Sequence, residues 1–258
     1  MLKRAVISTL QPLVAQRIYT VRHGLARGLR RRGGLGFVPQ LAALSPEERF
    51  LQTLTLDGET VFDVGGYEGI FTLFFARRVG PRGRVITFEP NPRNFARIVE
   101  NVQLNGFTRV QVRQLAAGSA PGRASLVFPA DETARGSLET RIADQIRQEH
   151  GVVSVEVELD TLDRQVAAGL PEPDFVKLDV EGLELDVLQG MHGLLERRHP
   201  RLYIEIHGAD VQRKLENVTA VVELLWTADY DVLHVETNTA LRRPDQLPLG
   251  IRGHLYCT

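Results

Sequence analysis

The sequence has little cysteine, no long apolar run and almost no net charge. Its 258 residues include one cysteine, Cys257, which excludes an intramolecular disulfide framework and a cysteine-rich zinc module. No segment approaches the ~20 apolar residues that a membrane-spanning helix needs, and the first 21 residues are too polar for a secretory signal core. The net charge of −1 gives no support for nucleic-acid binding. With 43% hydrophobic and 24% charged residues, the composition predicts a globular cytoplasmic protein.

Acidic residues are absent from positions 1–46, which contain eight lysines and arginines. The rest of the chain has 23 basic and 32 acidic residues, so its net charge is −9. We predict a basic helical extension over residues 1–40 and a main domain over 41–258, separated by a flexible break at glycines 33, 34 and 36. The extension can be a solvated helix packed on the domain or an organelle transit peptide. A third alternative is that residues 1–36 contact a membrane surface or an acidic partner.

From residue 47 onward, short apolar runs alternate with longer segments of helical periodicity. This alternation predicts successive strand–helix units. We expect an α/β, Rossmann-like, doubly wound and mainly parallel sheet of about seven strands. We also predict that 131–151 form a loop with one short helix, and that 254–258 form an edge strand. The buried strands of the sheet are expected at residues 61–64, 85–88, 175–180 and 202–206.

A glycine-rich turn directly follows the strand expected at 61–64. Gly65 and Gly66 allow a sharp turn and the close approach of a ligand, and Gly69 can lie where the next helix begins. Asp63 lies at the carboxyl end of the strand, where open α/β sheets bind their ligands. Glu89 ends the next strand, 24 residues after Gly65, where a carboxylate can accept both hydrogen bonds of a ribose diol. The pattern predicts a cofactor that contains a nucleoside.

The loop lacks the glycine patterns that bind phosphates. The dinucleotide pattern Gly-x-Gly-x-x-Gly fails at Tyr67 and Ile70, and no Gly-x-x-x-x-Gly-Lys loop occurs. Glu68 lies within the turn, so the loop suits an ammonium or sulfonium group better than a pyrophosphate. These features favour S-adenosylmethionine, with Tyr67, Glu68 and Asn91 as further cofactor-binding candidates. The alternative is an ordinary strand-to-helix turn.

Further motifs lie at set distances behind the glycine loop. They are Phe88-Glu-Pro-Asn-Pro, Asn101-x-x-x-Asn105, Val176-Lys-Leu-Asp-Val-Glu-Gly-Leu-Glu and Ile204-Glu-Ile-His. Together with Phe62-Asp-Val-Gly-Gly-Tyr-Glu-Gly they resemble the FkbM family of S-adenosylmethionine-dependent methyltransferases, over about residues 60–208. The resemblance implies the class I methyltransferase fold and methylation of hydroxyl oxygens, including those of macrolides and sugars.

The chain departs from the family pattern at two places. Members commonly have Ala-Asn where this chain has Gly66-Tyr67, so Tyr67 can reshape the methionine pocket. Many class I enzymes also have an acid after the third strand that binds the adenine amine, but this chain has Ala116-Ala117-Gly118-Ser119 there. We therefore expect adenine recognition by backbone groups and apolar packing.

Two strand ends offer residues for the chemical step. Methyl transfer is an in-line displacement that depends on alignment, and a hydroxyl acceptor must also lose its proton to a base or beside a metal ion. Lys177 and Asp179 lie on one side of an extended segment, and Glu205 and His207 lie likewise one strand later. If the two strands are neighbours, Asp179, Glu205 and His207 converge. They can bind a divalent cation such as Mg²⁺ or Mn²⁺, or His207 can be the general base.

Structural roles remain open for the same residues. Asp179 and Glu181 can cap a helix that begins near Gly182, because carboxylates are favoured at helix N-termini. Lys177 can be an ion-pair partner of Asp179, and His207 can be a structural histidine. Glu184, one turn into that helix, is expected on a solvated or capping face.

The leading functional prediction is an O-methyltransferase that acts on a hydroxyl of a small molecule, sugar or glycan. The alternatives are an N-methyltransferase and a catalytically silent, cofactor-binding partner subunit. A nucleic-acid acceptor is disfavoured because a core of net charge −9 would repel phosphates. Acceptor contacts are expected from residues 131–151 and from the loops after the later strands.

Overall fold

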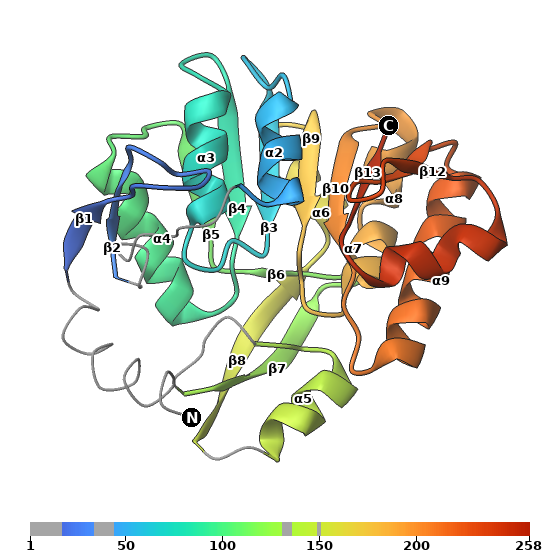
Figure 1. The fold of residues 1–258 in the computed structure, drawn as a ribbon. Helices are drawn as coiled ribbons and strands as arrows, with labels where there is room; N and C mark the ends of the chain where they lie inside the picture. The colour runs from blue at the N-terminus through green and yellow to red at the C-terminus, as the bar shows by residue number, and fades with distance from the viewer. Residues whose placement is uncertain (1–16, 34–43, 131–135, 149–150) are drawn as a thin grey trace.

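The computed structural model describes residues 17–33, 44–130, 136–148 and 151–258. Its centre is an eight-stranded sheet in the order β12-β11-β13-β10-β9-β3-β4-β5 (Figure 1). The five strands from β10 to β5 in that order run parallel, while β13 is antiparallel to both of its neighbours. The strands are β3 (Thr60–Val64), β4 (Arg84–Phe88), β5 (Val110–Arg113), β9 (Phe175–Leu178), β10 (Arg201–Glu205), β11 (Val232–His234), β12 (Thr239–Leu241) and β13 (His254–Cys257).

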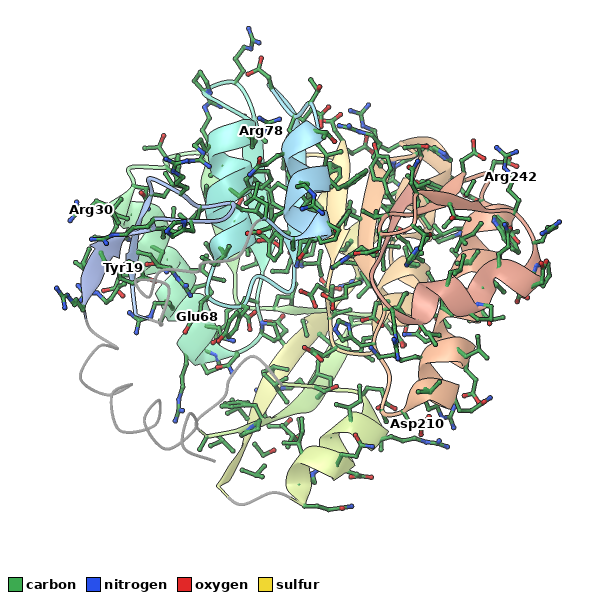
Figure 2. All side chains as sticks on the ribbon, viewed as in Figure 1. Tyr19, Arg30, Glu68, Arg78, Asp210 and Arg242 are labelled. Carbon is green, nitrogen blue, oxygen red and sulfur yellow. The ribbon has the colours of Figure 1, made fainter. Side chains whose placement is uncertain are left out.

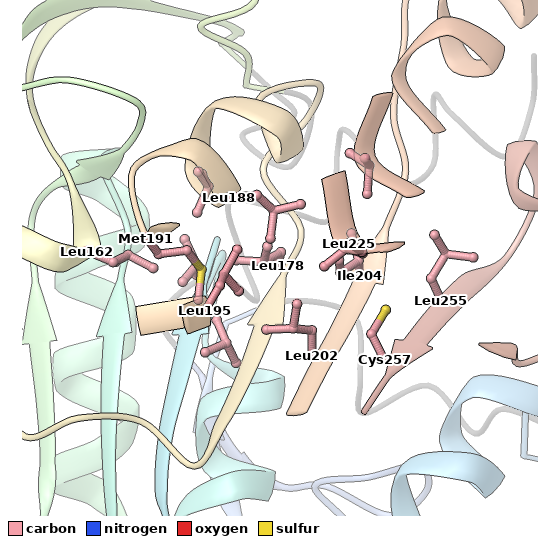
Figure 3. Close-up of a cluster of buried hydrophobic side chains, with 14 of the residues drawn as sticks. Leu162, Leu178, Leu188, Met191, Leu195, Leu202, Ile204, Leu225, Leu255 and Cys257 are labelled. Carbon is pink, nitrogen blue, oxygen red and sulfur yellow. The ribbon is translucent and has the colours of Figure 1, made fainter. Parts of the chain in front are cut away.

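Helices cover both faces of this sheet because successive strand residues point to opposite sides. Phe62 and Val64 belong to the larger core, whereas Val61 packs on the other face with α2 and α3. Figure 3 shows Leu188 of α7, Leu195 of α8 and Leu225 of α9 in this larger core. No helix in the described part of the chain is long and apolar enough to cross a membrane. The helices are α2 (Pro46–Thr53), α3 (Ile70–Arg78), α4 (Pro92–Leu104), α6 (Leu162–Ala167), α7 (Glu184–Gln189), α8 (His192–Arg197), α9 (Val211–Thr227) and the 3₁₀ helix η2 (Pro244–Ile251).

The doubly wound, mainly parallel α/β fold predicted from the sequence is confirmed. The sheet has one strand more than expected because the short β12 pairs with β11. The prediction of an edge strand at the chain end is wrong, since β13 lies between β10 and β11. Its residues Leu255 and Cys257 are fully buried in the larger core, which an edge position would not require.

A second, smaller sheet lies beyond the carboxyl ends of the central strands (Figure 1). Residues 122–129 and 152–160 form it as a long antiparallel pair, and a short strand joins the second of them in parallel. The segment between the pair contains the single short helix predicted for 131–151, while residues 131–135 and 149–150 lie outside the described residues. The elements are β6 (Ala116–Ala117), β7 (Gly122–Pro129), β8 (Val152–Asp160) and α5 (Thr140–Arg147).

The described part of the basic extension is a β-hairpin, so the prediction of a helical arm is wrong for residues 17–33. Strands β1 (Ile18–Thr20) and β2 (Arg30–Arg32) pair antiparallel beside α4 (Figure 1). Gly24 and Gly28 lie in the connection with φ of 76° and 86°, a left-handed conformation that glycine adopts readily and that stops a helix. Residues 1–16 lie outside the described residues, as do Gly34 and Gly36 of the expected break.

Candidate active site

A cavity of about 240 Å³ lies between the carboxyl ends of the central strands and the smaller sheet. This is the edge at which open α/β sheets bind ligands. The wall has a glycine loop and a buried carboxylate at one end and a group of charged side chains at the other. Its lining includes Gly65, Tyr67, Phe88, Glu89, Asn91, Asn94, Leu115, Ala116, Ala117, Leu126, Leu138, Asp179, Glu181, Glu205 and His207.

The glycine loop passes very close to the end of strand β9. A Cβ on Gly65 would lie 1.7 Å from the carbonyl oxygen of Asp179, and φ of Gly65 is 86°. Both observations require glycine at this position. Tyr67 also has a positive φ, 49°, and its backbone N–H donates to Glu89 Oε2 over 2.8 Å. The loop shape is therefore fixed by the carboxylate that the sequence assigns to ribose binding.

Glu89 is 5% exposed and accepts hydrogen bonds from two backbone N–H groups, those of Tyr67 and Asn91. Burial raises its pKa to about 7, although these hydrogen bonds favour the charged form. Asn91 caps α4 by accepting from the N–H of Arg93, and its side-chain Nδ2 is buried without a hydrogen-bond partner among the described residues. The cavity wall thus places an acceptor, the Glu89 carboxylate, near a buried donor, Asn91 Nδ2.

The wall next to Glu89 is apolar. Phe88, Leu115 and Leu126 lie there with Ala116 and Ala117, which form strand β6. All five side chains are buried, with exposed fractions of at most 6%. This wall fits the apolar packing expected for an adenine ring.

Asp179, Glu205 and His207 meet at the other end of the cavity. One ligand atom from each lies within 4.8 Å of the others. His207 Nε2 lies 3.8 Å from Asp179 Oδ1, 3.6 Å from Glu205 Oε1 and 3.9 Å from Glu181 Oε2. These separations exceed hydrogen-bond lengths. The strands are adjacent, as the sequence argument required, because β9 pairs with β10.

Glu184 fixes the orientation of His207, a contact that sequence reasoning missed. Glu184 is fully buried rather than solvated, and its Oε1 lies 2.9 Å from His207 Nδ1. Asn217 of α9 donates to Glu184 Oε2 and to the His207 carbonyl. Burial disfavours the imidazolium, but the Glu184 hydrogen bond and nearby carboxylates outweigh it and raise the pKa of His207 to about 9. The sequence did contain an indication of a role for Glu184, because Glu184 is the last residue of the Lys-Leu-Asp-Val-Glu-Gly-Leu-Glu motif.

Lys177 lies behind the cavity wall and pairs with carboxylates on two strands. Its Nζ is 3.1 Å from Asp179 Oδ2 and 3.8 Å from Asp63 Oδ1, and it sits 4.5 Å from the ring centre of Phe71. Burial opposes its charge, but Asp179 and Asp63 raise its pKa. Lys177 thus supports Asp179 as an ion-pair partner and does not line the cavity.

His254 is a second residue that sequence reasoning missed. Its ring lies 3.7 Å from Glu205 Oε2 and hydrogen-bonds Glu236. Contact with His254 lowers the pKa of Glu205 to about 2, so Glu205 is a carboxylate at neutral pH. The sequence did not indicate His254 because its contact with Glu205 requires β13 to lie beside β10, whereas the sequence predicted an edge strand.

Several predicted cofactor residues do not line the cavity. Asp63 is fully buried and accepts a hydrogen bond from Thr72 Oγ1, while Gly66 and Gly69 pack against Ile98. Glu68 instead pairs with Arg31 of the hairpin. The alternative that Asp179 and Glu181 cap a helix is not what the structure shows. Helix α7 begins at Glu184, and no side-chain hydrogen bond caps it at its N-cap residue, Leu183, in the described part of the chain.

Comparisons with known proteins show that the chain is similar to methyltransferases. The sequence model of the methyltransferase FkbM domain matches residues 63–232. Methyltransferase 1 of Beauveria bassiana is 29% identical over 52% of this chain and 59% of its own length. The hexuronic acid methyltransferase AglP of Haloferax volcanii is 28% identical over 65% of this chain and 66% of its own length. The chain therefore spans less than two thirds of either relative.

A solved structure shares the fold. The methyltransferase FkbM from Methylobacillus flagellatus KT superposes with a TM-score of 0.51 at 19% identity, over 83% of this chain and 50% of that one.

Proposed function

The chain belongs to the FkbM methyltransferase family, and we propose that it transfers a methyl group from S-adenosylmethionine to a hydroxyl oxygen of a sugar or another small molecule. One observation carries the proposal: a single cavity joins the buried Glu89 and its glycine loop to the group of Asp179, Glu205 and His207. The first end suits the cofactor and the second suits a hydroxyl that must lose a proton.

The residues at the first end fit S-adenosylmethionine. The Glu89 carboxylate has lone pairs left after its two backbone hydrogen bonds and can accept from a ribose diol. The buried Asn91 Nδ2 is a donor that gains a partner when a ligand binds, which removes the cost of leaving it unpaired. Gly65, whose close approach to the Asp179 carbonyl requires glycine, lines the cavity beside Glu89. Bound S-adenosylmethionine supplies an electrophilic methyl group on sulfur.

The charged end fits a divalent cation better than a free histidine base. A pKa of about 9 keeps the unliganded His207 imidazole protonated near neutral pH, so it holds no free lone pair for a proton. A cation can take the place of that proton at Nε2, while Nδ1–H still donates to Glu184. Asp179 and Glu205 supply oxygen ligands that suit Mg²⁺ or Mn²⁺. A cation here would lower the pKa of the acceptor hydroxyl.

The acceptor proposal draws on the same charged end. A hydroxyl acceptor needs help to lose its proton, whereas a neutral amine can attack without it, so the converging acids and histidine favour O-methylation over N-methylation. A silent partner subunit would have no chemical use for these side chains. The hexuronic acid methyltransferase relative supports a sugar acceptor.

A methyl-transfer assay with labelled S-adenosylmethionine tests the proposal. We expect transfer to acceptors that carry sugar hydroxyls, loss of turnover in EDTA and recovery on adding Mg²⁺ or Mn²⁺. Amine acceptors of the same skeleton are the control. Transfer to the amines alone would contradict O-methylation, and turnover unaffected by EDTA would leave His207 as the base.

A further inference from the structure

The N-terminal hairpin is attached to the domain through two asparagines of α4. Asn105 accepts from the backbone N–H of Arg30 over 2.8 Å and donates to the Arg30 carbonyl over 2.6 Å. Asn101 accepts from the backbone N–H of Arg32 over 2.7 Å. Hydrogen bonds to main-chain groups fix the register of β2 on the helix whatever the arginine side chains do. Strand β2 is therefore a positioned element.

This positioned strand contacts the glycine loop through Arg31. Its guanidinium forms an ion pair with the Glu68 carboxylate, and the two side chains are 8% and 22% exposed. Asn101, which holds β2, also donates from Nδ2 to the backbone carbonyl of Glu68 over 3.1 Å. The loop is thus held at Glu68 by a side-chain pair and by a main-chain hydrogen bond, both from the outer side. Figure 2 labels Glu68 in this loop and Arg30 on the hairpin.

Tyr67, the loop residue before Glu68, is held from the cavity side by Glu89. Tyr67 has φ of 49° and donates its N–H to Glu89, so the loop keeps a left-handed conformation between Glu89 on one side and Arg31 with Asn101 on the other. Such a conformation is strained for a residue with a side chain and persists only where its surroundings impose it. Loss of the contacts on either side, from Glu89 or from Arg31, should let the loop leave this conformation.

We propose that Arg31 is a positioning residue for the cofactor: the N-terminal hairpin holds the glycine loop in its binding conformation through the Arg31–Glu68 pair. The inference rests on the proposed function, because it concerns the affinity for S-adenosylmethionine. Arg31 touches neither the cavity nor the charged end, so it acts through Glu68 on the loop. The basic hairpin thereby becomes part of the cofactor site.

Calorimetric titration of S-adenosylhomocysteine into the full-length chain tests the inference. Arg31→Met should weaken binding about tenfold, the size of one lost charge-assisted hydrogen bond. Arg30→Met is the matched control, because Arg30 lies on the same strand with an exposed side chain and is held through its backbone. It should bind as the unmodified chain does.

A double-mutant cycle separates positioning from general destabilisation. Glu68→Gln, nearly the same shape as glutamate, should weaken binding like Arg31→Met, and the double variant should be no worse than either single one. In turnover assays KM for S-adenosylmethionine should rise while kcat and the acceptor KM stay unchanged. If Arg31→Met does not fold, Glu68→Gln carries the test alone.

The outcomes distinguish the two proposals. No binding by the unmodified chain contradicts the proposed function itself. If the unmodified chain binds and Arg31→Met or Glu68→Gln binds equally well, the inference is overturned. Additive effects in the double variant, or a fall in kcat without a change in KM, would overturn it as well.

Discussion

The two ends of the cavity are built differently. At the Glu89 end the polar groups are buried and engaged with the backbone, with hydrogen bonds of 2.8 Å to the carboxylate. At the His207 end three carboxylates lie 3.6 to 3.9 Å from one imidazole nitrogen, and their residues are partly exposed. The first end is largely hydrogen-bonded before a ligand binds, apart from the buried Asn91 Nδ2. The second leaves a space among charged groups that a cation or an acceptor can fill.

This contrast indicates that binding and chemistry are separable. Substitutions at the Glu89 end should change cofactor affinity, whereas substitutions at the His207 end should change turnover at unchanged affinity. The predictions below test that separation.

The largest effect is expected from His207→Ala. Loss of the proposed cation ligand or base should lower kcat by about 10³-fold, while the affinity for S-adenosylhomocysteine changes little. Steady-state kinetics and calorimetry measure the two quantities. His192→Ala is the control, because the His192 side chain is 68% exposed and pairs only with Glu196 on α8. A comparable loss of affinity in His207→Ala would mean that the two ends are not separable.

Glu89→Ala should have the opposite profile. The substitution removes the proposed acceptor for the ribose and releases the Tyr67 N–H, so we expect S-adenosylhomocysteine to bind about 50-fold more weakly. Calorimetry measures the change, with the exposed Glu196→Gln as control. Unchanged affinity in Glu89→Ala would remove Glu89 from the cofactor site.

The affinity should also depend on pH through Glu89. Its pKa of about 7 belongs to the unliganded protein, and ribose hydroxyls donate to the carboxylate, so binding favours the deprotonated form. Affinity for S-adenosylhomocysteine should therefore fall by up to about tenfold per pH unit as the pH drops below about 7. Glu181 has a similar pKa, also about 7, so Glu89→Gln is the informative comparison. A slope that persists in Glu89→Gln would assign the titration to another group.

The smallest effect concerns the orientation of His207. In Glu184→Gln the charge beside Nδ1 is lost, and the pKa of His207 should fall from about 9 by roughly one unit. Nuclear magnetic resonance titration of the imidazole protons in EDTA-treated protein measures it. His254 is an internal reference, because its pKa of about 9 depends on Glu205, Glu47 and Glu236. An unchanged His207 pKa would show that Glu184 does not stabilise the imidazolium.

The parallel half of the fold could be predicted because its determinants are local. Buried runs such as Val61–Val64 and Phe175–Leu178 are followed directly by turns, and glycine and acid positions follow from the strand ends. Adjacency of β9 and β10 then brought Asp179, Glu205 and His207 together. These steps need only chain direction and sheet geometry.

The missed features depend on contacts between distant parts of the chain. Arg31 reads as one charge of a solvated arm, yet it pairs with Glu68, 37 residues away. His254 reaches Glu205 only because β13 inserts between β10 and β11. Glu184 looked like a residue near a helix start, but its buried carboxylate accepts a hydrogen bond from Asn217 of α9, 33 residues away. Periodicity does not show such pairings, and the motif that contains Glu184 does not show its partners.

Calorimetric titration of S-adenosylhomocysteine into the unmodified chain tests the central claim most directly. The account predicts saturable one-to-one binding in the micromolar range or tighter, with affinity that falls in Glu89→Ala and holds in His207→Ala. The absence of binding to the unmodified chain would contradict the assignment of this cavity to S-adenosylmethionine.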